Sequence, residues 1–334
     1  MLIREELEEI EEKTLSKYAT LSKNSKGRTR EEEDCTQRTK FQRDRDRIIY
    51  SKAFRRLKYK TQVFISPEKD HYRTRLTHTL EVSQVARSIA RGLRLNEDLA
   101  EAIGLGHDLV HTPFGHAGEN VLNRVCKYGF RHNEQGLRVV EYIEKNNNMR
   151  GLNLTFEVKD GILNHSGNNM AQTLEGRIVK YADRIAYINH DIEDAISSNI
   201  IKKDDLPKDC IEILGNSSTK RINNMISNII TNSRNQNYIK MTDDFEEAML
   251  ALRKFMFENV YWSDVVKKAT DKAEHIVEEL YRQIEKNPNF LPEEWKENLE
   301  TEDIDRVACD YIAGMTDRYA INKFTDIFIP VPWK

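Results

Sequence analysis

The chain has 334 residues, 39% of them hydrophobic and 32% charged, which is enough for a sizeable apolar core in one large domain or two fused ones. A formal net charge of −3 excludes the global basic field that a bulk nucleic-acid binder carries. No stretch approaches the roughly 20 apolar residues that a membrane-spanning helix needs, and the N-terminus, where acidic and apolar residues alternate, lacks the pattern of a secretion signal.

Glycine and proline are sparse, at 14 and 7 residues, and long stretches repeat apolar residues with the period of a helix. Leu2, Leu7 and Ile10 begin the first of these stretches. The helices expected after it cover residues 79–93, 99–109, 117–126, 134–143, 178–196, 245–260 and 264–284. The short strand signals lie at Thr61–Ile65 and Tyr238–Met241.

Three polar segments are expected to connect these elements: residues 22–40, 146–154 and 202–208. The sequence shows neither a βαβ alternation nor a glycine-rich phosphate loop, so we expect an all-α fold with at most a small β-hairpin. The expected division is an N-terminal helix with a charged connector (1–42), a core (43–198) and a C-terminal helical region (199–334).

The four cysteines are scattered along the chain and form no CxxC pair. They are Cys35, Cys126, Cys210 and Cys309. This spacing favours neither a disulfide framework nor a cysteine zinc site, and it fits a reducing compartment. We therefore expect a cytoplasmic protein with no membrane partner.

The His107–Asp108 pair lies beside apolar Leu105 and Leu109. Burying these two side chains is unfavourable unless they pair or bind a metal ion. Imidazole and carboxylate ligands suit manganese, iron, cobalt, nickel or magnesium. Neighbours on a helix point about 100° apart, so the pair can share one divalent ion only if other helices supply further ligands.

His78, on the preceding helix, and Asp183, on the long helix 178–196, are the candidate partners. Four side chains from three helices would leave coordination sites for water and phosphate. The alternative is that His107–Asp108 is a structural ion pair. The order of a histidine, an HD pair and a distant helical aspartate favours the metal site.

The next cluster indicates proton chemistry. His111 follows His107 by four residues, which predicts a shared helix face. His116 opens the next segment after a proline, and Glu119 is three residues further on, where a carboxylate can orient the imidazole as a general acid. The alternative is an ordinary pairing at a helix N-terminus. His132 is a weaker candidate for a phosphate contact.

These residues carry a resemblance to a known family. The relevant stretches are RDRDRIIYSKAFRRLKYKTQVF from Arg43, RTRLTHTLEV, GLGHDLVHTPFGHAGE, RHNEQGLRVV, VKYADRIAYINHDIEDAI and DYIAGMTDRYA. Together they resemble the bacterial dGTP triphosphohydrolase branch of the HD superfamily over most of the chain. The resemblance implies an HD-domain helical fold with additional C-terminal helices that complete the substrate pocket. It also implies metal-dependent hydrolysis of dGTP or another dNTP to a deoxynucleoside plus tripolyphosphate, and homo-oligomers.

The resemblance also assigns roles to particular residues. The metal ligands match His78, His107, Asp108 and Asp183, with one ion per active site. His116 and Glu119 match the catalytic pair, and His111 the histidine that contacts phosphate. The substrate contacts match Arg75 and Arg253 at the phosphates, Gln62 and Asp191 at the sugar 3′-hydroxyl, and Tyr187 and Tyr261 at the sugar. Val110 departs from the family, where many members have glycine, but it removes no functional group.

The spacing of residues along the sequence tests some of these assignments and agrees with them. Asp183, Tyr187 and Asp191 recur every four residues and should share a helix face, although a solvated polar stripe has the same spacing. Arg253 and Tyr261 are eight residues apart and should also share a face, although a surface arginine and a core tyrosine would look alike. Nearby lysines, with Lys180 as the candidate, would help to neutralise the phosphates.

Two other classes of function remain open. One is a different HD phosphohydrolase activity, such as release of a nucleoside monophosphate or cleavage of a cyclic dinucleotide or an alarmone. The other is a nucleotide-sensing or single-strand-binding module, for which the basic and aromatic stretch Arg43–Lys60 could supply phosphate contacts and stacking. Asp44 and Asp46 interrupt that stretch and favour a helix with ion pairs. A second, activating nucleotide is a further partner that the sequence leaves open.

Overall fold

The computed structural model describes residues 2–62, 72–146 and 149–330. Over these residues the chain is all α apart from a two-stranded antiparallel hairpin, β1 (Lys145–Asn146) with β2 (Met149–Arg150), in which Lys145 pairs with Arg150. The prediction of an all-α fold with at most a small hairpin is confirmed.

The helices of the first part are α1 (Ile3–Thr14), η1 (Ser22–Asn24), α2 (Lys40–Tyr50), α3 (Lys52–Arg56), η2 (Leu57–Tyr59), α4 (Arg75–Leu93), α5 (Glu97–Gly106), α6 (His116–Val125), α7 (His132–Arg138), η3 (Val139–Ile143) and α8 (Phe156–Asn164). Those that follow are α9 (Leu174–Ser197), η4 (Lys203–Asp205), α10 (Lys208–Leu214), α11 (Ser218–Ser233), α12 (Asp243–Met256), η5 (Phe257–Tyr261), α13 (Asp264–Lys286), η6 (Pro288–Phe290), α14 (Glu293–Lys296), η7 (Glu297–Glu300), α15 (Ile304–Ala313) and α16 (Asp317–Phe328). The short segments η3 and η5 are π-helical turns that continue α7 and α12.

The two strand predictions have different outcomes. The strand expected at Tyr238–Met241 is wrong, because this segment is an irregular loop between α11 and α12. Side chains rather than a partner strand bond its backbone: Lys240 donates to and accepts from Ser233 Oγ. At the other position, Thr61 pairs with Thr74 in an isolated bridge, while Val63–Ile65 lies outside the described residues.

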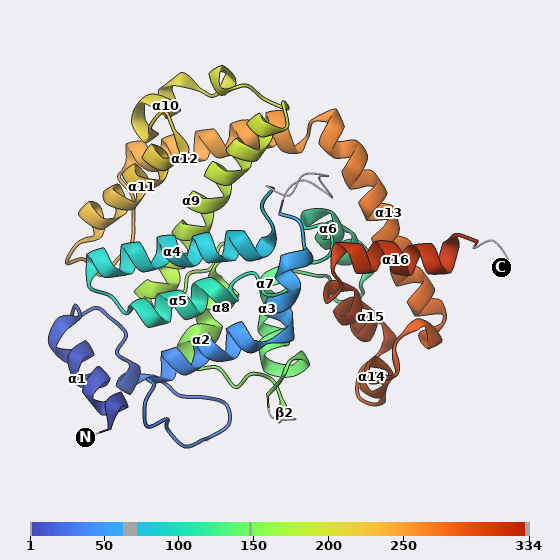
Figure 1. The fold of residues 1–334 in the computed structure, drawn as a ribbon, viewed down its shortest axis with the longest axis horizontal. Coiled ribbons are helices and arrows are strands. Elements are labelled where there is room, and N and C mark those ends of the chain that lie inside the picture. Colours follow the sequence, from blue (N-terminus) through green and yellow to red (C-terminus); the bar gives the residue numbers. More distant parts are fainter. Residues whose placement is uncertain (1, 63–71, 147–148, 331–334) are drawn as a thin grey trace.

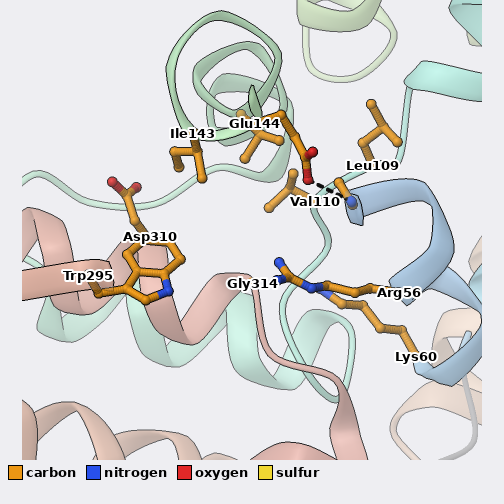
Figure 2. A pocket seen from close by; sticks show the side chains of 11 residues that line it. Arg56, Lys60, Leu109, Val110, Ile143, Glu144, Trp295, Asp310 and Gly314 are labelled. Atoms are coloured by element: carbon orange, nitrogen blue, oxygen red, sulfur yellow. Dashed lines mark hydrogen bonds between the residues drawn. The ribbon is translucent and has the colours of Figure 1, made fainter. Parts of the chain in front are cut away.

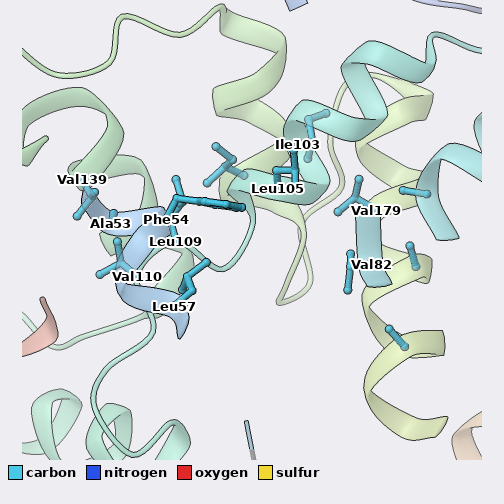
Figure 3. Packing of buried hydrophobic residues seen from close by; sticks show 14 of the residues in the cluster. Ala53, Phe54, Leu57, Val82, Ile103, Leu105, Leu109, Val110, Val139 and Val179 are labelled. Atoms are coloured by element: carbon cyan, nitrogen blue, oxygen red, sulfur yellow. The ribbon is translucent and has the colours of Figure 1, made fainter. Parts of the chain in front are cut away.

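Three helices, α4, α5 and α9, pack together and form the centre of the core (Figure 1). Val82, Ile103 and Val179 are fully buried where these helices meet (Figure 3). The contact between α4 and α5 is so close that a Cβ at Gly104 would lie 3.0 Å from Ser83 Cα. The apolar periodicity therefore places one face of each helix inward, and a glycine permits the close approach.

The segment expected to be a connector at residues 22–40 is held against the core. Arg28 pairs with Thr155 in an isolated bridge, and its guanidinium donates to Asp44 on α2. The ion-paired helix expected within residues 43–60 is present as α2, where Arg45 pairs with Asp98 and Glu101 of α5. The Arg28–Asp44 pair joins the 22–40 segment to α2, and the pairs of Arg45 join α2 to α5. These ion pairs explain why the polar segment lies against the core.

The C-terminal helices α13–α16 lie beside α3 and α6, at the opposite end of the molecule from α1 (Figure 1). No helix in the described part of the chain is long and apolar enough to cross a membrane. All four cysteines are free; Cys126, Cys210 and Cys309 are buried, and Cys35 is partly exposed.

Candidate active site

The His107–Asp108 pair does not lie on a helix, which corrects the expectation of a helix through residue 109. Helix α5 ends at Gly106, and residues 107–110 form a turn. The carbonyl of Gly104, which would accept from the backbone of residue 108 in a continuing helix, accepts instead from Nδ1 of His107 at 2.7 Å. His111 follows in a loop, so the predicted helix face shared by His107 and His111 is also wrong.

The turn is nevertheless fixed by packing. Leu109 and Val110 are buried, and they pack toward Ala53, Leu57 and Val139 (Figure 3). The Val110 side chain, where many relatives were expected to carry glycine, therefore belongs to the core. A hydrophobic anchor of this kind holds the neighbouring polar side chains in position.

His78, His107 and Asp183 come together from α4, the turn and α9. Asp183 Oδ1 lies 3.2 Å from His78 Nε2 and 3.8 Å from His107 Nε2, and one ligand atom from each residue lies within 4.8 Å of the others. Because Nδ1 of His107 donates to a carbonyl, its Nε2 carries a lone pair, and this buried atom has no hydrogen-bond partner. Two imidazoles and a carboxylate with an orphaned buried nitrogen fit a divalent metal ion.

Electrostatics keep Asp183 charged without an ion. Burial raises its pKa, but the hydrogen bond from His78 and the nearby His107 lower that pKa well below its ordinary value. Burial lowers the pKa of His107, which favours the neutral imidazole. Asp183 and His107 are thus held in the protonation states that a metal ion requires of its ligands.

Asp108, the fourth ligand expected from the sequence, is not part of that three-residue group. Its Oδ2 accepts from Arg75 Nη1 at 2.6 Å. Burial raises the pKa of Asp108, yet the Arg75 guanidinium and three neighbouring imidazoles lower it well below its ordinary value. The remaining donors of Arg75 reach the carbonyls of Thr61 and Gln62. In this structure Arg75 therefore orients Asp108. The contact between Arg75 and phosphate that the sequence led us to expect stays a prediction.

A second cluster surrounds Glu119 on α6. Its Oε2 lies 3.3 Å from Nδ1 of His116, whose side chain is 77% exposed. Its Oε1 accepts from the backbone N–H of His132 and lies 2.9 Å from Nδ1 of the same residue. The His111 ring stacks on His132 at 5.1 Å. The structure thus brings together all four residues of this cluster that the sequence singled out, and His111, Glu119 and His132 form a second group of close ligand atoms.

Charge is distributed unevenly within this cluster. Burial lowers the pKa of His132, but its hydrogen bond to Glu119 raises that pKa above the ordinary value. Burial and the Arg75 guanidinium lower the pKa of His111 well below the ordinary value, so its ring is neutral. Glu119 has a strongly lowered pKa despite its burial, because His116 and His132 bond to it. A fixed carboxylate therefore faces an exposed imidazole.

His165 joins the two clusters, and sequence reasoning missed it. Its ring lies 5.1 Å from that of His107 and 5.3 Å from that of His132. Nδ1 donates to the carbonyl of Ile162 at 2.7 Å, and Nε2 lies 3.3 Å from Nε2 of His132. It follows α8, a helix that was not predicted, so no periodic signal singled it out.

Helix α9 carries Asp183, Tyr187 and Asp191 on one face, as their spacing predicts. Arg253 Nε donates to the Tyr187 hydroxyl at 2.8 Å, and the Tyr261 hydroxyl donates to Asp191 Oδ2. Burial raises the pKa of Asp191 to about 7. The α12–η5 segment is thereby joined to α9.

Two buried acceptor atoms among the expected substrate contacts have no partner: Asp191 Oδ1 and Gln62 Oε1. Unsatisfied buried polar atoms are rare and indicate a missing ligand or water. Lys180 is different, because its Nζ donates to the carbonyls of Gly167 and Asn169. Its expected role at the phosphates therefore stays a prediction, with a structural role already visible.

The family comparisons agree on one affiliation. The HD domain model matches residues 75–188, and the phosphohydrolase-associated domain model matches residues 239–326. A deoxyguanosinetriphosphate triphosphohydrolase-like protein of Caldanaerobacter subterraneus is 57% identical over 333 residues, covering 100% of this chain and 98% of that protein. A protein of the same description from Clostridium perfringens is 50% identical, covering 99% and 98%.

Among solved structures, that of a hypothetical protein from Aquifex aeolicus superposes with a TM-score of 0.49 at 20% identity. The superposition covers 85% of this chain and 71% of that one. The alignment with the Caldanaerobacter relative covers the whole chain, so the candidate site residues on α4–α9 and on α12 and η5 fall within it.

Proposed function

Because this chain belongs to the deoxyguanosinetriphosphate triphosphohydrolase-like family of HD-domain phosphohydrolases, we propose that it hydrolyses a deoxynucleoside triphosphate to a deoxynucleoside and tripolyphosphate. The observation that supports this most is the meeting of His78, His107 and Asp183 beside the pair His116–Glu119. One cluster suits a metal ion, and the other suits proton transfer to a leaving oxygen.

A divalent ion bound by His78, His107 and Asp183, with Asp108 beside them, would withdraw charge from the α-phosphate and lower the pKa of a bound water. Manganese, magnesium, cobalt, nickel and iron all suit this ligand set. Asp108 lies in the same turn as His107, and Arg75 holds its carboxylate.

In the proposed reaction, a water oxygen attacks the α-phosphorus while the bond to the 5′-oxygen breaks. His116 gives its proton to the departing oxygen, and Glu119 holds the imidazole in place through its contact with Nδ1. Glu119 is in turn held by two bonds from His132. His111, neutral and buried against these rings, is the proposed phosphate contact.

The rest of the substrate would lie along α9. Asp191 Oδ1 and Gln62 Oε1, both buried without a partner, are suited to bond the sugar 3′-hydroxyl. Tyr187 and Tyr261 would border the sugar. Arg253, which contacts Tyr187, would neutralise the triphosphate together with Lys180, Arg75 and His132.

The test is to incubate the protein with each dNTP and manganese, singly and as a mixture, and to identify the products. Intact tripolyphosphate with a free deoxynucleoside supports the proposal. Release of orthophosphate, pyrophosphate or a nucleoside monophosphate would instead indicate another HD phosphohydrolase activity. Hydrolysis only in the mixture would indicate a second, activating nucleotide, which stays a prediction, as do homo-oligomers and single-strand binding.

A further inference from the structure

The first residue of α16, Asp317, bonds to the loop of residues 111–115 that precedes α6, which we call the catalytic loop. Asp317 is 4% exposed, and its Oδ1 accepts from the backbone N–H of Phe114 at 2.9 Å. Its Oδ2 accepts from the backbone N–H and the hydroxyl of Thr61 at 2.9 and 2.8 Å. One carboxylate therefore joins the C-terminal region, the loop before α6 and the segment that carries Gln62.

The bonded loop has an unfavourable backbone conformation. Phe114 has φ +62° and Gly115 has φ +61°, and a left-handed conformation is uncommon for a bulky residue such as phenylalanine. Such a conformation persists only where the surroundings impose it. Since His116 comes next and begins α6, the conformation of Phe114–Gly115 sets where its imidazole lies.

The buried Lys60 side chain also connects the C-terminal region to the catalytic loop. Lys60 is 2% exposed, and its Nζ donates to the carbonyl of Ala313 at 2.8 Å and to that of His111. Figure 2 shows the Lys60 side chain and Gly314 on one side of a small pocket, with Leu109 and Val110 across from them. The catalytic loop is thus tied to the C-terminal region at His111 and again at Phe114.

We propose that Asp317 is a positioning residue for the general acid: by holding the Phe114 N–H it keeps the loop in the conformation that presents His116. This inference rests on the proposed function. The side-chain bonds of Asp317 go to Phe114 and Thr61, so its proposed effect on His116 passes through the Phe114–Gly115 backbone. It also gives the phosphohydrolase-associated region, residues 239–326, an indirect part in the proposed catalysis.

The first test is Asp317→Asn, because the amide has only one acceptor oxygen where the carboxylate uses two, one for the Phe114 N–H and the other for the Thr61 N–H. We expect kcat to fall by about 10²-fold, as a displacement of the order of 1 Å can cause, with KM and metal content within about twofold of wild type. The matched control is Asp326→Asn on the exposed part of α16, which should leave kcat unchanged.

A double variant separates positioning from general damage. If Asp317 acts through His116, His116→Ala combined with Asp317→Asn should be no slower than His116→Ala alone. Losses that multiply would overturn the inference, as would a kcat of Asp317→Asn equal to that of wild type.

Hydrogen exchange tests the contact without activity. In the wild type the Phe114 amide should exchange slowly although it lies in a loop, and in Asp317→Asn residues 111–118 should exchange faster while α4 is unchanged. A rapidly exchanging Phe114 amide in the wild type would refute the hydrogen bond to Asp317 as a constraint on the loop, even if Asp317→Asn fails to fold. A wild type that makes no tripolyphosphate but protects Phe114 would refute the proposed function alone.

Discussion

At the scale of single residues, His116 differs from the other histidines of the site because it is exposed, while Glu119 beneath it is fixed. His116→Ala removes the proposed general acid, and a positioned acid typically contributes about 10²–10⁴ in rate. We expect tripolyphosphate release to fall by that factor, with the unfolding midpoint unchanged. Turnover at the wild-type rate would contradict the assignment.

Asp191 is the residue whose protonation should be visible in stability. Burial raises its pKa to about 7, whereas an aspartate in an unfolded chain titrates near 3.9. The folded state therefore holds one more proton between about pH 4 and pH 7, and this group makes the protein less stable as pH rises through that window.

Asp191→Asn should remove that dependence. The free energy of unfolding of the variant, minus that of wild type, should increase from about pH 4.5 to about pH 7 and then level off. Urea titrations with a chelator present measure it, with Asp326→Asn as the control. A difference that does not change with pH would show that Asp191 is ionised throughout.

At the scale of elements, α4, the turn after α5 and α9 meet at His78, His107 and Asp183. Asp183→Ala removes the carboxylate that approaches both imidazoles, so metal binding and activity should be lost together. Saturating the wild type with manganese at 100 times its Kd should stabilise it by about 2.7 kcal/mol, and the variant should show no such shift in Tm. Stoichiometric metal retained by Asp183→Ala would indicate another ligand set.

A buried carboxylate of α2 is one of the groups that hold the N-terminal segment against the core. Asp44 is fully buried and accepts from Arg28 and from the backbone N–H and hydroxyl of Thr155. Asp44→Ala would leave the N–H and hydroxyl of Thr155 without an acceptor, at about 1–3 kcal/mol for each buried donor, while Arg28 would keep its ion pair with Glu32. Asp46→Ala, which breaks pairs with partly exposed arginines, should cost about 0–1 kcal/mol. Chemical denaturation of both variants would measure the difference, and equal losses would contradict this account.

At the scale of the whole molecule, the boundary expected near residue 198 stays a prediction, but many buried contacts cross it. Asp310 accepts from Gln135 and Arg138, and the bonds of Asp317 and Asp191 also span it. We expect residues 43–198 expressed alone to lack a cooperative unfolding transition, because these polar groups would lose their partners. A sharp calorimetric transition in that fragment would show an independent core.

The sequence by itself determined the fold class and singled out most residues of the candidate site. Apolar periodicity located α4, α9 and α13 because one face of each must be buried, and the spacing of Asp183, Tyr187 and Asp191 placed them on one face. The histidines and carboxylates were singled out because burying them together requires a partner. These signals are local, since they concern residues within a few turns of each other.

Only the tertiary structure decided how those side chains meet. It ended α5 before His107, paired Asp108 with Arg75, placed His165 between the two clusters and brought Asp317 to Phe114. The strand expected at Tyr238–Met241 failed because the side chain of Ser233 bonds that backbone. The contacts of Asp108, His165 and Asp317 join segments that no local pattern relates. They depend on how the helices pack, because only the packed fold brings these buried polar groups within hydrogen-bonding distance.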